Sequence, residues 1–257
     1  NVACQIADTQ SAVRFASLVP NADDGGDIRA CATRLLVADA RAAIDPWLQC
    51  AIDWDSTIAY RQRLWRLGLG VAEAMDTAQR GMGLDWATTQ ELIARSAAQA
   101  REYGARIASG AGTDHLAADV DSLDEVLAGY ETQLSFVEST GSQAILMASR
   151  QLARAATGFD DYAKVYDRLL TQAERPVIMH WLGTAFDPAL EGYWGSADVA
   201  TATANFLDLI TTPADKVDGV KVSLLDADHE KGLRAALPAG VRLYTGDDFN
   251  YRELIKG

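Results

Sequence analysis

The chain has 257 residues, of which 49% are hydrophobic, and its formal net charge is −13. This length is typical of one α/β barrel, and the apolar content is enough for a large core. The acidic excess argues against nucleic acid or an anionic membrane surface as a partner, because both are held by Lys and Arg. No run of about 18 uninterrupted apolar residues occurs, so we expect no membrane span.

Residues 1–27 are mixed in composition and end in a Gly- and Asp-rich stretch, so we expect an N-terminal extension there. This extension lacks a basic region followed by an apolar run, so we do not expect it to be a signal peptide. The three cysteines, Cys4, Cys31 and Cys50, are far apart. An odd number of widely spaced cysteines is typical of a reduced protein, and we expect a cytoplasmic location.

From residue 30 onward, short apolar runs alternate with longer stretches of helical periodicity. The predicted strands cover residues 30–38, 68–75, 105–110, 143–148, 176–182, 217–224 and 241–245. The predicted helices cover residues 54–67, 86–103, 122–139, 160–172 and 198–210. Within the third helix, Ser122 followed by Glu125 fits a capping box.

This alternation of strands and helices predicts a parallel sheet. Neither a G-x-G-x-x-G segment nor a P-loop occurs, so a nucleotide-binding fold has no support. Seven successive strands favour a TIM (β/α)8 barrel over residues 28–257. Its eighth strand and closing helices are missing from the sequence, and we expect the chain to be truncated at its C-terminus.

The most informative residue is Lys221, which lies in the middle of an apolar predicted strand. Gly219, Lys221 and Ser223 share one side of that strand. Val220, Val222 and Leu224 share the other side, which is apolar and suits a helix layer. We therefore expect Lys221 to face the barrel interior. Burial favours the neutral amine that attack on a carbonyl requires, which predicts a Schiff-base nucleophile. The alternative is a lysine whose amine reaches solvent at a strand end.

Other polar residues follow the predicted strands, where barrel enzymes place their catalytic groups. Our candidates for proton transfer are Glu73, Asp76 and His180. Our candidates for substrate binding are Arg80, Arg150, Ser223, Asp247 and Asp248.

Most of these candidates also have a structural interpretation. The carboxylates can cap helices or hold turns. Arg150 can pair with an acid, and His180 can be a hydrogen-bonded core histidine. We interpret Tyr193 and Trp194 as loop packing, with the lining of a pocket mouth as the alternative.

At these residues the chain resembles the dihydrodipicolinate synthase and N-acetylneuraminate lyase superfamily of class I aldolases. The superfamily carries its Schiff-base lysine in a G-[IV]-K strand and ends the next strand in S-G-D-D; the counterparts here are Gly219-Val-Lys221 and Thr245-Gly-Asp-Asp248. More closely, the chain resembles a dihydrodipicolinate synthase-like bacterial branch, through the block 70–86 and the segments 180–183 and 246–251. The resemblance implies a TIM barrel with Lys221 as the imine-forming residue.

Two departures from the superfamily pattern point to a different substrate. The G-T-T-G-E segment that binds a carboxylate and relays protons is replaced by Val71-Ala-Glu-Ala-Met-Asp76. The proton-shuttling tyrosine after the fourth strand is absent, and Arg150 aligns there. Retention of the lysine with altered partners favours imine chemistry outside lysine biosynthesis.

Our leading hypothesis is a class I aldolase or lyase in carbohydrate or carboxylate catabolism. In it, Lys221 forms a Schiff base with a 2-oxo acid or a sugar-derived ketone, and no cofactor or metal is needed. We expect a homo-oligomer, either a dimer or a tetramer. One alternative is a metal-dependent barrel lyase or isomerase that uses Glu73, His180 and Asp247 as ligands. Another is a non-catalytic sugar-binding relative.

Overall fold

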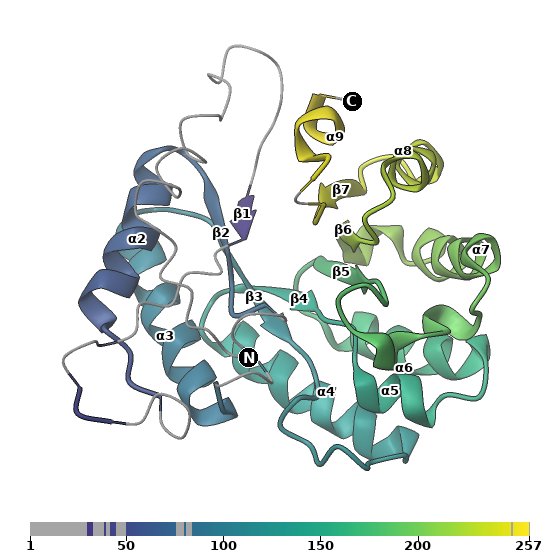
Figure 1. Cartoon of the computed structure of the whole chain (residues 1–257), viewed down its shortest axis with the longest axis horizontal. Helices are drawn as coiled ribbons and strands as arrows, with labels where there is room; N and C mark the ends of the chain where they lie inside the picture. The colour runs from purple at the N-terminus through teal and green to yellow at the C-terminus, as the bar shows by residue number, and fades with distance from the viewer. Residues whose placement is uncertain are drawn as a thin grey trace. The chain divides into compact units, whose positions relative to one another are not determined.

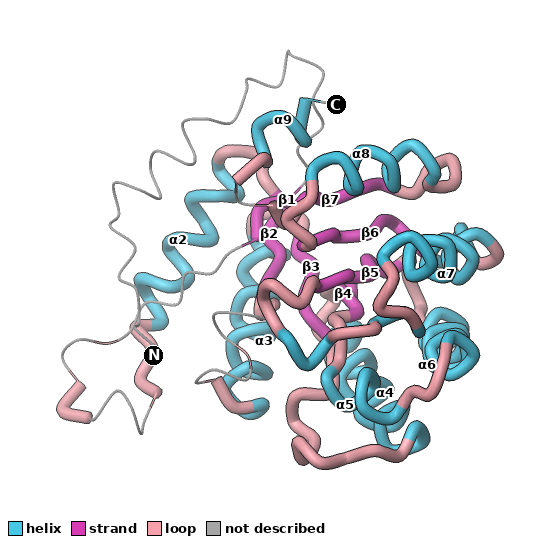
Figure 2. The backbone as a smooth tube through the Cα atoms, turned by 45° about the vertical axis from the view of Figure 1, so that its right-hand side comes forward, coloured by secondary structure: helices cyan, strands magenta, loops and turns pink. Residues whose placement is uncertain are grey.

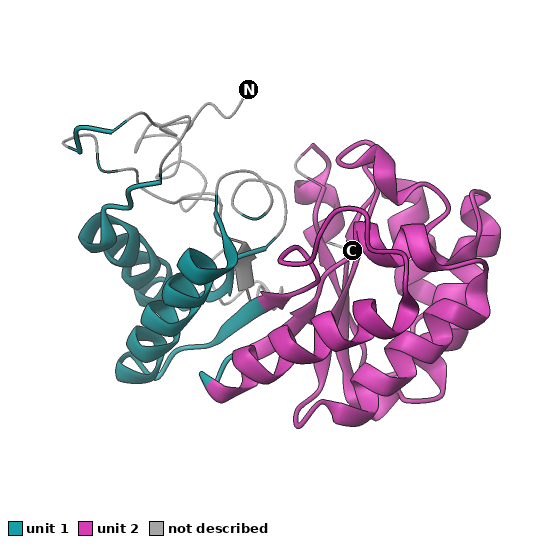
Figure 3. Cartoon of the chain, turned by 90° about the horizontal axis from the view of Figure 1, so that it is seen from below, with its two compact units in different colours: residues 1–109, 140–142 teal, residues 110–139, 143–257 magenta. Residues whose placement is uncertain are grey.

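A computed structural model describes residues 30–32, 39, 42–44, 50–75, 80, 84–247 and 249–256. The predicted extension 1–27 and the candidates Asp76 and Asp248 lie outside the described residues. The chain divides into two compact units, residues 1–109 with 140–142 and residues 110–139 with 143–257 (Figure 3). Strand β3, Ile107–Ala111, contributes residues to both units.

The described part of unit 1 contains parallel strands and two helices. Its strands are β1 (Ala30–Ala32), β2 (Gly70–Glu73) and the first three residues of β3, paired in that order. Its helices are α2 (Trp54–Arg66) and α3 (Trp86–Glu102). Each helix is preceded by an aspartate, and the aspartate side chain accepts a hydrogen bond from a backbone N–H of the first turn. This N–H has no acceptor within the helix, so the aspartate caps the helix. Leu64 and Trp65 of α2 pack on Val71 of β2 and Ala100 of α3 in its core.

Unit 2 continues the parallel pairing in chain order, from the end of β3 to β7 (Figure 1). Its further strands are β4 (Gln143–Leu146), β5 (Val177–Leu182), β6 (Val217–Ser223) and β7 (Arg242–Thr245). Its α-helices are α4 (Leu123–Ser139), α5 (Arg150–Ala155), α6 (Phe159–Gln172), α7 (Val199–Thr211), α8 (Ala227–Ala236) and α9 (Tyr251–Lys256). Short 3-10 helices are η2 (Pro188–Leu190), η3 (Tyr193–Gly195) and η4 (Ala214–Lys216).

Helices α6, α7 and α8 lie along one side of strands β5 to β7 (Figure 2). Trp181 of β5 marks this side, because its ring centroid lies 5.3 Å from those of both Phe206 of α7 and His229 of α8. Val220 and Val222 of β6 are fully buried, and Val222 pairs in register with Trp181. Since side chains alternate along a strand, Lys221 lies on the opposite face, which we call the inner face.

This parallel α/β arrangement is consistent with an incomplete TIM barrel, and the element positions largely follow the sequence prediction. Helices α2, α3, α4, α6 and α7 occupy the predicted ranges to within one or two residues. The predicted strands are also found, and of 30–38 the structure describes Ala30–Ala32 as strand. Helices α5, α8 and α9 were not predicted.

Among the described residues, three that are not glycine adopt left-handed backbone conformations. Ala74 has φ 48° and directly follows β2, Leu225 has φ 60° and follows the end of β6, and Trp194 has φ 66° within η3. This region of φ is unfavourable for residues with a Cβ atom, so the surrounding contacts must hold it.

Candidate active site

The candidate site is built around Lys221 on the inner face of unit 2. In the sheet register, Lys221 pairs with His180 of β5 on one side and with Tyr244 of β7 on the other. Lys221 is half-buried and His180 is fully buried. A lysine, a histidine and a tyrosine are therefore neighbours in register on three adjacent strands.

A hydrogen bond joins His180 to Ser223, which is also buried. The Nε2 atom of His180 lies 3.3 Å from Oγ of Ser223, two residues beyond Lys221 along β6. Both residues belong to the inner face by the register of the two strands. The imidazole and hydroxyl thus form a polar pair on the carboxyl-terminal side of Lys221, the side where barrel enzymes react.

Gly246 makes room for this pair. A Cβ atom at Gly246 would overlap Oγ of Ser223 and would lie 2.8 Å from the carbonyl oxygen of Val222. The backbone N–H of Gly246 donates to that carbonyl at 2.6 Å. The glycine of the Gly-Asp-Asp segment therefore has a steric role, which is close approach to β6.

A second polar group, formed by residues of β6 and β7, was not predicted from the sequence. The Tyr244 hydroxyl donates to Oδ2 of Asp218 at 2.7 Å, and Arg242 forms an ion pair with Asp218. Gly219 accommodates the ring, since a Cβ atom there would lie 2.6 Å from Cε2 of Tyr244. Burial, followed by the hydrogen bond to Asp218, raises the pKa of Tyr244 to about 12, so this phenol stays protonated at neutral pH.

Arg150 begins α5, just after β4, and forms an ion pair across two loops. Its Nε atom lies 2.5 Å from Oδ2 of Asp187, which precedes η2. The Arg150 side chain is 61% exposed. Arg150 thus follows the carboxyl end of β4, where its guanidinium connects the two loops, and its role in substrate binding stays a prediction.

Asp247 is buried and caps the turn before α9. Its Oδ1 accepts the backbone N–H groups of Phe249 and Asn250, and its Oδ2 accepts Nδ2 of Asn250. Burial raises the pKa of Asp247, but the hydrogen bonds from Asn250 and Phe249 outweigh it and the pKa is lowered overall. This is the capping role that the sequence also allowed for the Gly-Asp-Asp segment.

Glu230 of α8 is a buried carboxyl that sequence reasoning missed. Its Oε2 accepts the Thr245 hydroxyl at 3.2 Å, and its Oε1 has no hydrogen-bond partner. Burial is the main reason that the pKa of Glu230 is raised to about 7; the nearby Asp247 carboxylate adds to the increase, while Thr245 and Arg234 oppose it.

Glu73 and Arg80 belong to unit 1 and are both buried. Glu73 accepts Nε and Nη2 of Arg61 at 2.7 and 2.9 Å, the Ser96 hydroxyl at 2.7 Å and the backbone N–H of Ala74 at 3.0 Å. These bonds connect β2 to both helices of the unit and favour a structural role. The Arg80 guanidinium lies 5.4 Å from the Trp86 ring centroid, a cation–π distance.

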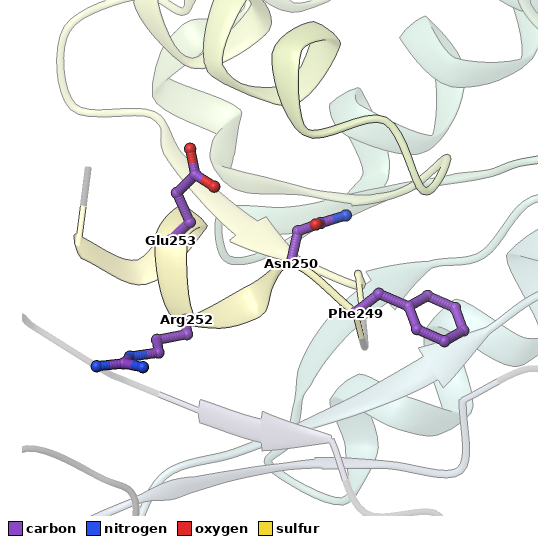
Figure 4. Close-up of a pocket in the computed structure, with 4 residues that line it drawn as sticks. All are labelled: Phe249, Asn250, Arg252 and Glu253. Carbon is purple, nitrogen blue, oxygen red and sulfur yellow. The ribbon is translucent and has the colours of Figure 1, made fainter.

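The described residues of unit 2 line at least two hollows. One, of about 320 Å³, lies at the carboxyl ends of β5 and β6 and is partly lined by Tyr193, which is buried as predicted together with Trp194. The other, of about 350 Å³, is lined by Phe249, Asn250, Arg252 and Glu253 around the start of α9 (Figure 4). The second hollow is open to solvent, since Phe249 is 80% exposed, and contains none of the predicted site residues within the described part of the chain.

Among the described residues, no three His, Cys, Asp or Glu side chains are grouped so that they could hold a metal ion. None of the described helices is both long and apolar enough to cross a lipid bilayer.

Comparisons with known proteins agree with this architecture. A family model described as "Protein of unknown function (DUF993)" matches residues 16–257. A search of the curated proteins found no match.

Two of the solved structures that match this chain illustrate the similarity in fold. A dihydrodipicolinate synthase from Bacillus anthracis has a TM-score of 0.63 and 12% identity, with 89% of this chain and 67% of that chain covered. A 2-keto 3-deoxygluconate aldolase from Picrophilus torridus has a TM-score of 0.58 and 14% identity, with 89% and 71% covered. Both belong to the superfamily that the sequence resembles, so the resemblance is confirmed at the level of the fold.

Proposed function

We propose that this chain, which belongs to the DUF993 family, is a Schiff-base-forming aldolase or lyase acting on a 2-oxo acid or a sugar-derived ketone. The observation that carries the proposal is the position of Lys221. It lies on the inner face, level with His180 and two residues before Ser223 in β6. The two fold neighbours are enzymes of this general kind, which supports an activity of the same kind.

The reaction begins when the neutral Lys221 amine attacks the substrate carbonyl carbon. A C–N bond forms, and the carbonyl oxygen leaves as water after it has received two protons. The resulting iminium withdraws electrons from a carbon–carbon bond one carbon away, which breaks and leaves an enamine. The departing carbon carries a hydroxyl, which gives up its proton to a base, so that this fragment leaves as an aldehyde or ketone. Protonation of the enamine and hydrolysis of the C–N bond release the product and regenerate the amine.

The polar pair of His180 and Ser223 is positioned to move the protons of this sequence. Proton transfer needs a donor or acceptor within hydrogen-bond reach of the reacting group, and histidine serves this role most often. The 3.3 Å contact would let Ser223 exchange a proton with the substrate and His180 with Ser223. Arg150 contributes a substrate-carboxylate site in this proposal, because its ion pair with Asp187 uses Nε and the Nη groups are further donors.

Borohydride trapping tests this proposal. Treatment with pyruvate and sodium borohydride should add one reduced adduct, which peptide mass spectrometry should place on Lys221. Lys221→Ala should abolish the adduct, and so should Lys221→Arg, because a guanidinium stays protonated. Lys164→Ala is the matched control, since Lys164 is an exposed lysine of α6. An adduct that persists in Lys221→Ala would overturn the proposal.

The geometry gives less support to a metal-dependent lyase. Of the three ligands considered, Glu73 accepts hydrogen bonds from Arg61 and Ser96, and Asp247 accepts them from the turn before α9. A metal would have to displace these donors. An eight-stranded closed barrel, a homo-oligomeric state and a cytoplasmic location stay predictions.

A further inference from the structure

Tyr244 of β7 borders Lys221 on the side of β6 that faces away from β5. The two residues pair in register, and Gly219 pairs with Arg242 two residues earlier on each strand. Residues that pair in register on parallel strands project their side chains to the same face of the sheet, so Tyr244 belongs to the inner face. No step of the proposed reaction uses this tyrosine.

The Tyr244 ring lies towards the amino-terminal end of β6. A Cβ atom at Gly219 would come within 2.6 Å of Cε2 of the ring. The hydroxyl lies further in the same direction, where it donates to Oδ2 of Asp218 at 2.7 Å. Because Gly219 lies two residues before Lys221 on the same face, the ring covers the inner face of β6 on the amino-terminal side of Lys221.

Contacts at both ends of the ring hold it in this position. The absence of a side chain at Gly219 allows the ring edge to approach the strand closely. At the far end, the hydroxyl is bound to Asp218, which also forms an ion pair with Arg242. Since a tyrosine side chain has only two rotatable bonds before its ring, these contacts restrict its orientation.

The carboxyl-terminal side of Lys221 is different in character. Ser223 lies two residues further along β6, and its hydroxyl contacts His180, which pairs in register with Lys221. On the inner face of β6, Lys221 therefore has an aromatic ring on one side and a polar pair on the other. A lysine side chain loses more rotamer freedom than most when it is fixed, so a rigid neighbour that removes unproductive conformers is useful for reaction.

We infer that Tyr244 is a positioning residue for Lys221. Its ring blocks the conformers of Lys221 that point towards the amino-terminal end of β6, and so directs the amine towards Ser223 and His180. Tyr244 acts through Lys221 and not on the substrate. This inference rests on the proposed function and specifies how its nucleophile is oriented.

The test measures how fast the imine forms on Lys221. Pyruvate is mixed with the protein at a series of concentrations, samples are quenched with borohydride at successive times, and the Lys221 adduct is counted by peptide mass spectrometry. Tyr244→Ala should lower the maximal rate constant at least tenfold and leave the half-saturating pyruvate concentration within threefold. The final amount of adduct should be similar to that of the parent chain, whereas loss of folded protein would lower the final amount and leave the rate constant unchanged.

Matched variants separate the ring from its hydroxyl and from general packing. Tyr244→Phe keeps the ring over Gly219 and should retain the rate constant within threefold. Leu243→Ala removes an apolar side chain from the opposite face of the same strand, where Leu243 pairs with Val220, and should also stay within threefold. If Tyr244→Ala does not fold, Tyr244→Leu serves the same comparison, because leucine keeps an apolar side chain on β7 but is too short to cover Gly219.

The outcomes separate this inference from the proposed function. Absence of any Lys221 adduct in the parent chain would overturn both. Adduct formation in the parent chain, combined with equal rate constants for Tyr244→Ala and Leu243→Ala, would overturn the positioning role alone. A Tyr244→Phe variant as slow as Tyr244→Ala would also overturn it, because the hydroxyl and not the ring would then be required.

Discussion

His180 and Ser223, which lie on adjacent strands and 43 positions apart in the chain, approach each other to 3.3 Å between Nε2 and Oγ. The contact is made on the face of the sheet that carries Lys221. A serine hydroxyl alone is a weak acid and a weak base. Its hydrogen bond to an imidazole allows a proton to pass between the two groups.

Removal of the Ser223 hydroxyl should separate imine formation from later proton transfer. We expect Ser223→Ala to slow exchange of the pyruvate methyl protons with deuterium by about 100-fold, within the range of general acid–base catalysis. Trapping of the imine itself should fall much less. Proton NMR in heavy water measures the exchange, and Ser135→Ala, at an exposed serine of α4, is the control. Equal loss of trapping and exchange would contradict a role confined to proton transfer.

Gly246 should not tolerate a side chain. Gly246→Ala places a methyl group against Ser223 and the Val222 carbonyl, and we expect a loss of about 1–3 kcal/mol in the free energy of unfolding. Gly232→Ala in α8 is the matched control, because a Cβ atom there meets nothing within 4 Å. That control should gain roughly 0.5–1 kcal/mol through better helix propensity. Urea denaturation measures both, and similar stabilities for the two variants would refute the steric argument.

The buried pair of Glu73 and Arg61 should matter for stability more than for proton transfer. Glu73→Gln leaves the Arg61 charge buried without its counter-charge, which costs about 3–5 kcal/mol. Glu91→Gln, the same substitution at an exposed pair with Arg95, should cost no more than about 0.5 kcal/mol. If Glu73→Gln unfolds like the parent chain but loses pyruvate exchange, Glu73 is a proton carrier as the sequence first indicated.

Glu230 should make the fold less stable as pH rises towards neutrality. Its pKa is about 7 in the folded state, against 4.5 for an ordinary glutamate. The folded state therefore keeps a proton that the unfolded state releases, and the associated stability is complete below about pH 4.5 and lost by about pH 7. We expect Glu230→Gln to raise the melting temperature at pH 8 and to change it little at pH 4.5. Glu174→Gln, at an exposed carboxyl in the turn between α6 and β5, is the control. An equal effect of Glu230→Gln at both pH values would show that burial does not hold the proton.

Much of the fold could be predicted because its longer elements carry strong periodicity. Helix α6 buries Tyr162, Val165, Tyr166, Leu169 and Leu170 at helical spacing. Helix α8, in contrast, buries only Glu230 and Leu233, so its sequence lacks an apolar stripe and gave no signal. Helices α5 and α9 have six residues each and are too short for such a pattern.

The site was less predictable, because its contacts depend on how distant strands are aligned. The alternation of side chains along β6 was enough to predict that Lys221 lies on the face opposite Val220 and Val222. The contact of His180 with Ser223 depends on the register of β5 against β6, which shifts between Val177 and Ile178. The ion pair of Asp218 with Arg242 likewise joins two strands, and no local spacing indicates it.

The left-handed residues at the exits of β2 and β6 have a consequence for how freely these loops can evolve. A glycine at Ala74 or Leu225 would relieve roughly 1–2 kcal/mol of unfavourable backbone conformation. It would also widen the range of directions in which the chain can leave the strand. Alanine and leucine have a narrower range of allowed backbone angles in this region than glycine. The chain therefore leaves each strand in a fixed direction, from which any insertion in the following loop would start. Libraries that vary loop length after β6 should therefore keep Leu225 unchanged and diversify the residues beyond it.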